Sequence, residues 1–491
     1  MPILYIVLSL AGLAILAFAL RVGKTVLERR YYERQGIKFV RTYPFIGSEV
    51  DVTDLIGTNR TRDYLYVGAT TTDFVGSIRG FDIQLYAVNK ETTEVLVKPS
   101  TIGVYTDRDT PALYSFGQLS PSALTFTPIR TVNFSERKAN ILKAFELERM
   151  DAISDRLARE YCDGFAGGGV LDMKRIVRDW TRDVMGEFVW GREAMNASVS
   201  YKDKDGKTQQ VPFMFSLNET FTRLRFYSNR FWNRVYFPIA TWPVTLEARR
   251  LQFNIRHLQA HLNRSLKTNP APPGSVSHEV TKENELVGIP TQITRDDLLT
   301  VSIAGLDTVQ SMILASLWYL LLPENSQWKD AILSSQEPDR ELIVDACINE
   351  AIRIDPPGSV INNKTIKDFP VEVSGRRYHL KKGVRVMPNI HALHAEYGAA
   401  YQPERFLETQ SRRDVYVMPF GKGRRSCPGQ RIGVLMAKNY VREFVTRNPN
   451  ATIMNTEDEH IHFNNLSRSK LMIGLPGEGD RRELQTSALS E

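Results

Sequence analysis

The chain has 491 residues, of which 42% are hydrophobic and 24% charged, and its formal net charge is +7. This is ample for a large core, and no internal repeat or long low-complexity tract marks a separate module. No compact basic and aromatic array is present, so no nucleic-acid partner is expected. The modest positive charge fits either an ordinary solvated surface or attraction to an anionic membrane or an acidic partner.

Three cysteines, Cys162, Cys347 and Cys427, lie far apart in the chain. No CxxC pair exists, which argues against a structural zinc site. An odd and low count is not typical of a disulfide framework, so it favours a domain that faces a reducing compartment.

Residues 3–20 are almost continuously apolar and reach the lower end of the length that spans a bilayer. A cleaved signal peptide is the competing interpretation, but no basic residue precedes the run. Four follow it: Arg21, Lys24, Arg29 and Arg30. By the positive-inside rule the sequence predicts a single-pass signal anchor over residues 1–22, a linker over 23–45, and a cytoplasmic domain at the endoplasmic reticulum membrane.

The first half of the chain alternates between strand and helix patterns. Alternating residues predict short strands at 65–67 and 82–88, and helical spacing predicts helices over 92–97, 135–160 and 171–190. Residues 199–210 are a polar insertion with an Asp205-Gly206 turn signal. Residues 213–242 are rich in aromatics, and core packing competes equally with a role as an apolar pocket wall or membrane-dipping surface.

The second half is more strongly helical. Residues 269–289 are expected to form a connector, and Thr294 to Asp297 resemble a capping box that opens a long apolar helix to Leu322. A helix over 339–353 and three short strands follow, and residues 477–491 are expected to be a flexible tail. The fold class is therefore mainly α with minor β, of the α+β type.

The ten residues from Phe420 to Gly429 form a segment that could hold a reactive or metal-binding cysteine. They contain three glycines, two adjacent arginines and Cys427, and an apolar helical run begins at Ile432. Neighbouring positive charge and a helix N-terminus both favour a thiolate. These residues alone leave open whether Cys427 is a nucleophile, a metal ligand or a buried apolar side chain.

The central helix contains Ala304-Gly305-Leu306-Asp307-Thr308. Glycine in a helix costs up to ~1 kcal/mol relative to alanine and is kept where the helix packs closely or opens. A groove with a hydroxyl and a carboxylate is one interpretation; a packing notch is the other, and alone it is favoured. Glu350-Ala351-Ile352-Arg353 pairs charges at i and i+3, and a network with Arg405 would be structural.

Together these pieces, in this order, resemble the cytochrome P-450 superfamily of haem-thiolate enzymes, eukaryotic and membrane-anchored, in a style similar to fungal members. Residues 420–429 match F-x-x-G-x-R-x-C-x-G, and residues 304–308 match (A/G)-G-x-(D/E)-T. Glu350 to Arg353 matches E-x-x-R, and Pro403 to Phe406 matches P-E-R-F. The resemblance implies a P-450 fold over residues 46–476, with the long central helix over the haem.

The resemblance also implies roles for single residues. Cys427 would ligate the haem iron, with Phe420 packed beside the sulfur. The other residues would serve as follows: Arg425 as a propionate partner, Ala304 and Gly305 as the groove over the haem, Thr308 and Asp307 as the catalytic pair in oxygen activation and proton relay, and Glu350, Arg353 and Arg405 as a structural triad. Two positions depart from the family pattern. Phe134 and Lys138 stand where W-x-x-x-R is usual, with Arg137 one residue earlier, so Lys138 is the candidate propionate contact. Asn363-Lys364 stands where an arginine is usual.

The implied cofactor is haem b, with O₂ and NADPH as co-substrates. Electrons would come through a separate flavoprotein reductase, and the substrate would be a lipophilic small molecule such as a terpenoid, a polyketide or a related secondary metabolite. A monomer is expected. A haem-thiolate isomerase or dehydratase and a non-enzymatic haem protein are the alternatives; the Asp307-Thr308 pair argues against the former. A cysteine hydrolase would need a histidine near Cys427.

Overall fold

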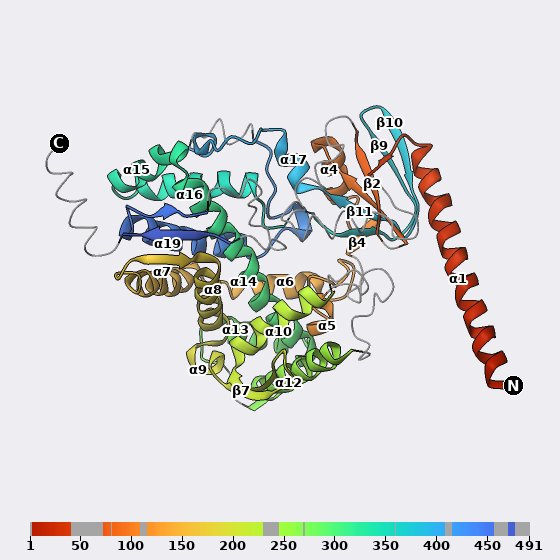
Figure 1. The fold of residues 1–491 in the computed structure, drawn as a ribbon, viewed down its shortest axis with the longest axis horizontal. Coiled ribbons are helices and arrows are strands. Elements are labelled where there is room, and N and C mark those ends of the chain that lie inside the picture. Colours follow the sequence, from red (N-terminus) through yellow and green to blue (C-terminus); the bar gives the residue numbers. More distant parts are fainter. Residues whose placement is uncertain are drawn as a thin grey trace.

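The structure is a computed structural model that describes residues 2–40, 72–79, 81–108, 115–228, 245–268, 271–358, 360–407, 415–455 and 470–476. The strand expected at 65–67, the aromatic segment beyond residue 228 and the tail at 477–491 lie outside the described residues. Most of the molecule is a helical body, and a smaller sheet region lies at one end of it (Figure 1).

Helices of the body surround a long central helix, α14 (Thr291–Leu321). The helices before it are α4 (Lys90–Val97), α5 (Ser115–Leu119), α6 (Phe134–Lys143), α7 (Leu147–Asp163), α8 (Met173–Trp190), α9 (Arg192–Met195), α10 (Phe213–Ser228), α12 (Leu246–Thr268) and α13 (Val276–Leu286). Those after it are η2 (Pro323–Asn325), α15 (Ser326–Ser334), α16 (Asp339–Ile354), α17 (Ile390–Ala395), η3 (Pro403–Phe406), η4 (Gly423–Arg425) and α19 (Gln430–Arg447). The mainly helical prediction is confirmed.

A six-stranded mixed sheet, in the order β1-β2-β3-β11-β8-β4, forms the core of the sheet region. Its strands are β1 (Lys38–Phe39), β2 (Phe74–Arg79), β3 (Asp82–Ala87), β4 (Thr106–Arg108), β8 (Asn363–Thr365) and β11 (Arg385–Pro388). The remaining strands form smaller sheets: β5 (Gly169–Asp172), β6 (Ser198–Lys202), β7 (Thr208–Pro212), β9 (Phe369–Val373), β10 (Arg376–Leu380), β12 (Thr452–Ile453) and β13 (Met472–Leu475). Strands β8 and β11 come from late in the chain, so the sheet joins its two ends.

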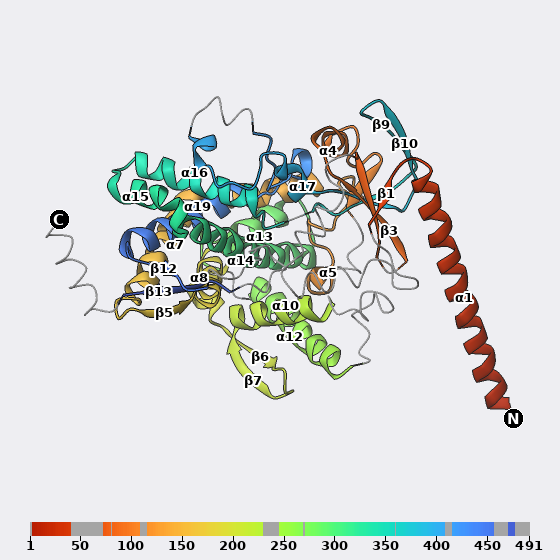
Figure 2. The ribbon, with the colours of Figure 1, turned by 45° about the horizontal axis from the view of Figure 1, so that its top comes forward.

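Helix α14 runs through the centre of the body (Figure 2) and packs on α8, α16 and α19. Within the described ranges it is the helix that is long and apolar enough to cross a membrane by length and composition, yet 72% of that apolar window is buried inside the protein. A helix that is apolar on all sides is stable in water only inside a core. The sequence prediction of a central buried helix is confirmed.

The start of α14 differs from the sequence prediction. The helix begins at Thr291, so Thr294 lies inside it and accepts a hydrogen bond from Asn284 instead of capping. Residues 269–289 contain a helix, α13, where a connector was expected. Ser275 caps α13 by accepting the N–H of His278, a local signal that the Pro-rich neighbourhood obscured.

The N-terminal helix α1 (Pro2–Glu33) is a single helix that continues through much of the range assigned to a linker. It leans away from the sheet region as a long arm (Figure 1). Its C-terminal part is docked: the Thr25 hydroxyl donates to the Phe81 carbonyl at 2.9 Å, and the Arg21 guanidinium lies 4.9 Å from the Phe81 ring centre. Tyr32 is 1% exposed and accepts the Lys381 N–H.

The polar insertion at 199–210 is a β-hairpin of β6 and β7, and Gly206 at its tip has a φ of 90° that suits glycine. The hairpin lies against α12, where Asn254 accepts the N–H of Lys202 and donates to its carbonyl. The sequence signal located the turn but did not indicate the paired strands.

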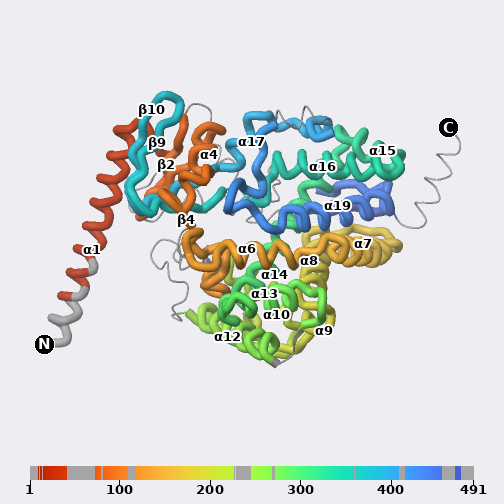
Figure 3. The backbone as a smooth tube through the Cα atoms, turned by 180° about the vertical axis from the view of Figure 1, so that it is seen from behind, coloured from red at the N-terminus to blue at the C-terminus, as the bar shows by residue number. Residues whose placement is uncertain are grey.

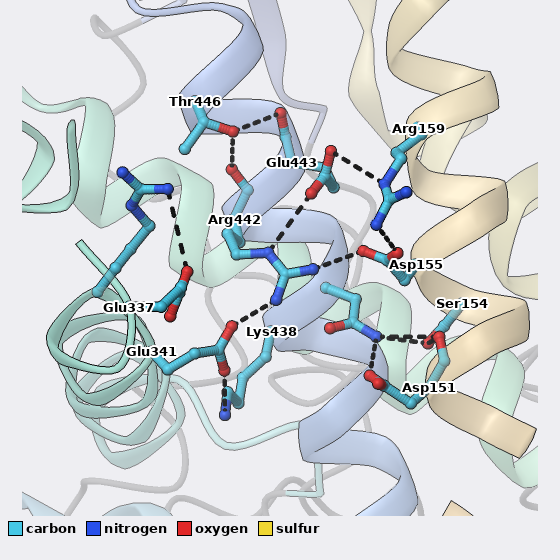
Figure 4. A network of polar contacts seen from close by, with 12 residues as sticks. Asp151, Ser154, Asp155, Arg159, Glu337, Glu341, Lys438, Arg442, Glu443 and Thr446 are labelled. Atoms are coloured by element: carbon cyan, nitrogen blue, oxygen red, sulfur yellow. Dashed lines mark hydrogen bonds and ion pairs between the residues drawn. The ribbon is translucent and has the colours of Figure 1, made fainter. Parts of the chain in front are cut away.

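Helices α7, α16 and α19 lie side by side on the back of the molecule (Figure 3). Figure 4 shows that Arg442 of α19 extends between the other two helices. It pairs with Glu341 of α16, and its Nη2 lies 2.5 Å from Asp155 Oδ1 of α7. Lys438 also binds Glu341, at 2.5 Å. This network clamps α19, the helix that directly follows Cys427.

Candidate active site

The loop before α19 is folded by its own backbone. Gly421 and Gly423 both have φ values of 69°, which favour glycine because a Cβ would be strained there. The Cys427 N–H donates to the Phe420 carbonyl at 2.8 Å, closing the loop on itself. The Phe420 side chain packs at the edge of the main hydrophobic core. The glycine spacing of the sequence is therefore required by the turn that presents Cys427.

The Cys427 thiol lies three residues before the first residue of α19, as the sequence predicted. Cys427 is exposed, and the flanking Ser426 and Pro428 are half-buried. Burial of the surrounding site raises the pKa of Cys427, and the Gly429 N–H and the Lys138 ammonium act in the opposite direction. These two groups are the local stabilisers of a thiolate at this position.

One face of α14 is open next to this loop. Ala304 is exposed on a helix whose other residues are mostly buried, and Thr308 one turn later is half-buried on the same face. The Thr308 hydroxyl donates to the Ala304 carbonyl at 2.5 Å. A Cβ added to Gly433, in the first turn of α19, would lie 3.6 Å from Val309. The start of α19 therefore packs against α14 at Val309, the residue after Thr308.

Asp307 points away from Thr308. Its carboxylate forms an ion pair with Arg225 of α10, and Lys174 and Arg178 of α8 lie nearby. Burial raises the pKa of Asp307, while Arg225 and the other two cations oppose that rise. The two members of the predicted catalytic pair are adjacent in sequence, but they lie on different faces of the helix.

Gly305 has a packing role in the structure. A Cβ at this position would lie 2.5 Å from the sulfur of Met185 on α8, so any larger residue would require the Met185 side chain to move. This is the packing notch that the sequence also allowed. Its predicted part in a haem groove stays a prediction, and the exposed residue of the motif is Ala304.

Arg425 is held firmly from several sides. Its Nη2 lies 2.5 Å from Asp107 Oδ1 and 2.5 Å from the Thr127 carbonyl, and its guanidinium lies 4.5 Å from the Phe134 ring centre. Burial lowers the pKa of Arg425, and the Asp107 carboxylate partly restores it. Its Nε is buried and has no hydrogen-bond partner among the described residues.

The two cations expected on α6 serve other contacts. Lys138 Nζ donates to the carbonyls of Arg424 and Ser426, at 2.9 and 3.0 Å, and so grips the loop next to Cys427. Arg137 is buried and forms a two-bond pair with Asp297 at the start of α14. An ammonium is a point charge that carbonyls satisfy well, whereas a guanidinium matches a carboxylate.

Sequence reasoning missed Arg108. It lies on β4 directly opposite Asn363 of β8, where the resemblance led us to expect an arginine. Its Nη1 donates to the Asn362 carbonyl at 3.1 Å. The pairing crosses more than 250 residues, so only the sheet register reveals that a cation is supplied from the neighbouring strand.

Glu350 and Arg353 form a completely buried pair with bonds of 2.7 and 2.8 Å. Glu350 also accepts the Gln402 N–H at 3.0 Å, which fastens the η3 segment to α16. Arg405 lies farther away, with its Nε 3.8 Å from Glu350. The predicted network exists, and its third member is the weakest.

The arrangement fits a haem group. Cys427 is exposed at a helix start, and Ala304 and Thr308 form an exposed strip on the neighbouring helix α14, where small side chains leave room for a flat ring. Arg425 presents a buried Nε without a partner, which is a suitable donor for a carboxylate at the ring edge. A single anionic thiolate is a known way to hold haem iron.

Comparisons with known proteins agree with this geometry. A family model described as Cytochrome P450 matches residues 334–461, the segment that contains both α16 and Cys427. Over this segment the chain is therefore similar to the cytochrome P450 family. The crystal structure of a cytochrome P450 (CYP102L1) superposes with a TM-score of 0.67 at 16% identity, covering 87% of this chain and 99% of that one, so the P450 fold is confirmed.

Curated relatives match over shorter stretches. Cytochrome P450 84A4 of Arabidopsis thaliana is 31% identical over 177 residues, which cover 32% of this chain and 34% of that protein. Cytochrome P450 82A1 of Pisum sativum is 30% identical over 135 residues, covering 25% of this chain and 24% of that protein. Protopine 6-monooxygenase of Eschscholzia californica is 20% identical over 66% of this chain and 69% of that protein. The first relatives are thus matched over about a quarter to a third of their length.

Proposed function

We propose that this P450 is a haem-thiolate monooxygenase that inserts one oxygen atom from O₂ into a lipophilic small molecule. The observation that carries the proposal is the position of the exposed Cys427, three residues before α19, whose first turn packs against α14 at Val309, the residue after Thr308. The name of one relative, a 6-monooxygenase, supports the same reaction class.

Haem b is the proposed cofactor, and when bound it would supply O₂ binding and reductive activation, which an anionic sulfur ligand promotes. Cys427 would hold the iron. Arg425 and Arg108 would bind the carboxylates of the ring edge, since Arg425 lies in the Cys427 loop and pairs with Asp107, the residue before Arg108.

Thr308 and Asp307 would manage protons on the open face of α14. The Thr308 hydroxyl gives its own hydrogen to the Ala304 carbonyl, so its lone pairs are free to hold a water molecule. Asp307 lies one residue away with a pKa raised by burial, which brings it nearer to neutral pH as a proton source. Water has to connect the two side chains, because they point in different directions.

The substrate class and redox partner belong to the same proposal. A terpenoid, a polyketide or a related secondary metabolite would suit the apolar core around α14. Electrons would come from NADPH through a separate flavoprotein reductase. Lys422, Arg424 and Arg431 are all exposed beside Cys427 and would attract an acidic partner.

The membrane location rests on α1. Its N-terminal part exposes large apolar side chains, which are Leu13, Ile15, Leu16 and Leu20, each more than half exposed. Exposed apolar surface of this kind is stable in a bilayer. We therefore propose a monomer with a single span in the endoplasmic reticulum membrane and the haem domain on the cytoplasmic side.

The reduced carbon monoxide difference spectrum of the purified full-length protein tests the haem-thiolate site. The wild type is expected to show the thiolate-ligated band, and Cys427→Ala is expected to lose it. A wild type that binds no haem overturns the proposal. Product formation that requires both NADPH and O₂, with a reductase added, tests the reaction class; turnover without either would indicate an isomerase or dehydratase.

A further inference from the structure

We propose that His394 is a positioning residue that connects the Glu350–Arg353 helix to the loop presenting Cys427. The proposal rests on the haem-thiolate function, because its consequence is a change in thiolate ligation. His394 belongs to none of the motifs in the sequence, and it lies on the short helix α17, 33 residues before Cys427.

The His394 ring makes two hydrogen bonds in the interior, where the side chain is 1% exposed. Its Nδ1 lies 3.0 Å from the Arg353 carbonyl oxygen, and its Nε2 lies 3.0 Å from the Met418 backbone nitrogen. The carbonyl is only an acceptor and the backbone N–H only a donor. The ring must therefore be neutral, with its hydrogen on Nδ1 and a free lone pair on Nε2.

The connection to α16 is reciprocal. Arg353 Nη1 donates to the His394 backbone carbonyl at 3.1 Å, while the His394 ring donates to the Arg353 carbonyl. Two residues that hold each other through both backbone and side chain have little freedom to rotate. The ring is thus fixed by the most deeply buried ion pair near the site, that of Glu350 and Arg353.

The connection to Cys427 runs through the loop backbone. The Met418 N–H points to His394, and the Met418 carbonyl accepts the Gly421 N–H at 3.0 Å. That turn places the Phe420 carbonyl where the Cys427 N–H binds it at 2.8 Å. A change in the tilt of the Met418 peptide would therefore move the acceptor that holds the cysteine backbone.

Other side chains hold the part of the Cys427 loop that follows the turn, whereas His394 contacts the part before it. Lys138 binds the carbonyls of Arg424 and Ser426, which follow the turn, and Arg405 is more loosely placed near Glu350. His394 holds the loop before the turn at Met418, and the Tyr397 hydroxyl accepts the N–H of Tyr416 two residues earlier. Loss of His394 should loosen the start of the loop while Lys138 still holds its end.

Replacing His394 by asparagine or glutamine, whose side-chain amides differ in reach, distinguishes the two hydrogen bonds of the ring. In His394→Asn the amide occupies the position of Nδ1, so it can donate to Arg353 but cannot reach Met418. In His394→Gln the amide reaches the position of Nε2, so its oxygen can accept the Met418 N–H. The control for simple loss of stability is Val344→Ala, at a fully buried apolar position of α16, the helix that also carries Arg353.

The experiment uses the full-length, haem-loaded protein. The ratio of the thiolate-ligated band to the band of protein that has lost the thiolate is read from reduced carbon monoxide spectra, well below each variant's unfolding temperature. His394→Asn is expected to raise the thiolate-lost fraction roughly three- to tenfold, the range that loss of one neutral hydrogen bond produces. His394→Gln should stay within about twofold of the wild type, and Val344→Ala should lower Tm without changing the ratio.

The result is decisive in each direction. Equal ratios in His394→Asn and the wild type overturn the role of His394, as does an equal loss in Val344→Ala at a matched fall in Tm. A larger thiolate-lost fraction in His394→Gln than in His394→Asn also contradicts the proposal, because the bond to Met418 would then not be the one that maintains thiolate ligation. If the wild type itself shows no thiolate band, the haem-thiolate function fails instead.

Discussion

Asp307 of α14 and Arg225 of α10 form an ion pair in the protein interior, 82 residues apart in sequence. The pair turns the Asp307 carboxylate away from Thr308, although the two residues are neighbours. Burying a carboxylate is costly without a partner, and Arg225 provides that partner. The structure therefore places the Thr308 hydroxyl at the exposed face of α14 and the Asp307 carboxylate on a different face, paired with Arg225.

This separation predicts the effects of three substitutions. Asp307→Asn and Thr308→Val should each lower product formation by about 10²-fold or more, since a positioned proton donor contributes on that order. Thr308→Ser should retain most activity because it keeps the hydroxyl. All three should keep the thiolate-ligated spectrum, measured beside turnover with NADPH and reductase. Full activity of Asp307→Asn would exclude Asp307 from proton delivery.

The sequence predicted local features well and distant contacts poorly. The position of Cys427 before a helix depends on ten consecutive residues, so the pattern sufficed. Arg225 carries no motif, and its contact with Asp307 requires α10 to pack on α14. The same reason explains why Arg108 was missed and why the bonds of Lys138 to two loop carbonyls were not predicted, since those carbonyls lie far along the chain. These are consequences of tertiary packing, which no short window encodes.

The ion pair of Arg425 and Asp107 is the second point for a test. Both side chains are less than a tenth exposed, and Asp107 also accepts the Ile129 N–H at 3.0 Å. Breaking a buried pair costs about 3–5 kcal/mol because a charge is left without its partner. Asp107→Ala should therefore lower the free energy of unfolding by that order and speed haem loss, measured by denaturant titration and gel filtration.

The exposed pair of Lys143 and Glu283 is the matched control for Asp107→Ala. Its ammonium lies 2.6 Å from the carboxylate, but Lys143 is 67% exposed. Solvent-exposed pairs contribute about 0–1 kcal/mol, so Lys143→Ala should have little effect on unfolding or haem loss. A similar loss in both variants would mean that burial of the Arg425 pair is not what matters.

The clamp around Arg442 predicts how α19 is stabilised. Arg442→Met keeps the length of the side chain but removes its bonds to Glu341, Asp155 and Glu443. The network is about four-fifths buried, so the free energy of unfolding should fall by about 1–3 kcal/mol, between the values for exposed and buried ion pairs. Thermal unfolding measures it. Lys143→Met, which removes the exposed pair with Glu283, should change Tm far less.

The continuous helix α1 predicts two separable effects of truncation. Deleting residues 2–17 should release the protein from membranes in a flotation assay but leave Tm unchanged, because the docking contacts of Phe18, Arg21, Thr25 and Tyr32 remain. Deleting residues 2–32 should also lower stability by about 3–5 kcal/mol, the usual effect of losing a buried aromatic side chain. Continued flotation of the shorter deletion would contradict a single anchor in this helix.

The neutral state of His394 predicts a specific pH dependence of stability. Burial lowers the pKa of His394 to about 3, with the neighbouring His391 and Arg353 side chains acting in the same direction and the bond to the Arg353 carbonyl opposing it. In the unfolded chain the pKa is about 6.5. Between these values the unfolded chain binds one more proton than the native protein, so stability rises with pH across this window. This group alone contributes up to about 1.4 kcal/mol per pH unit, fully present above pH 6.5 and lost as the pH falls toward 3.

Replacing the ring isolates this contribution. His394→Gln cannot titrate, so the slope of its unfolding free energy between about pH 6.5 and pH 4 should be smaller than that of the wild type by up to about 1.4 kcal/mol per pH unit. Urea titrations at several pH values measure both slopes on the full-length protein. Parallel curves for the two proteins would mean that His394 binds a proton in the native state, and the tautomer that holds Arg353 and Met418 together would then be wrong.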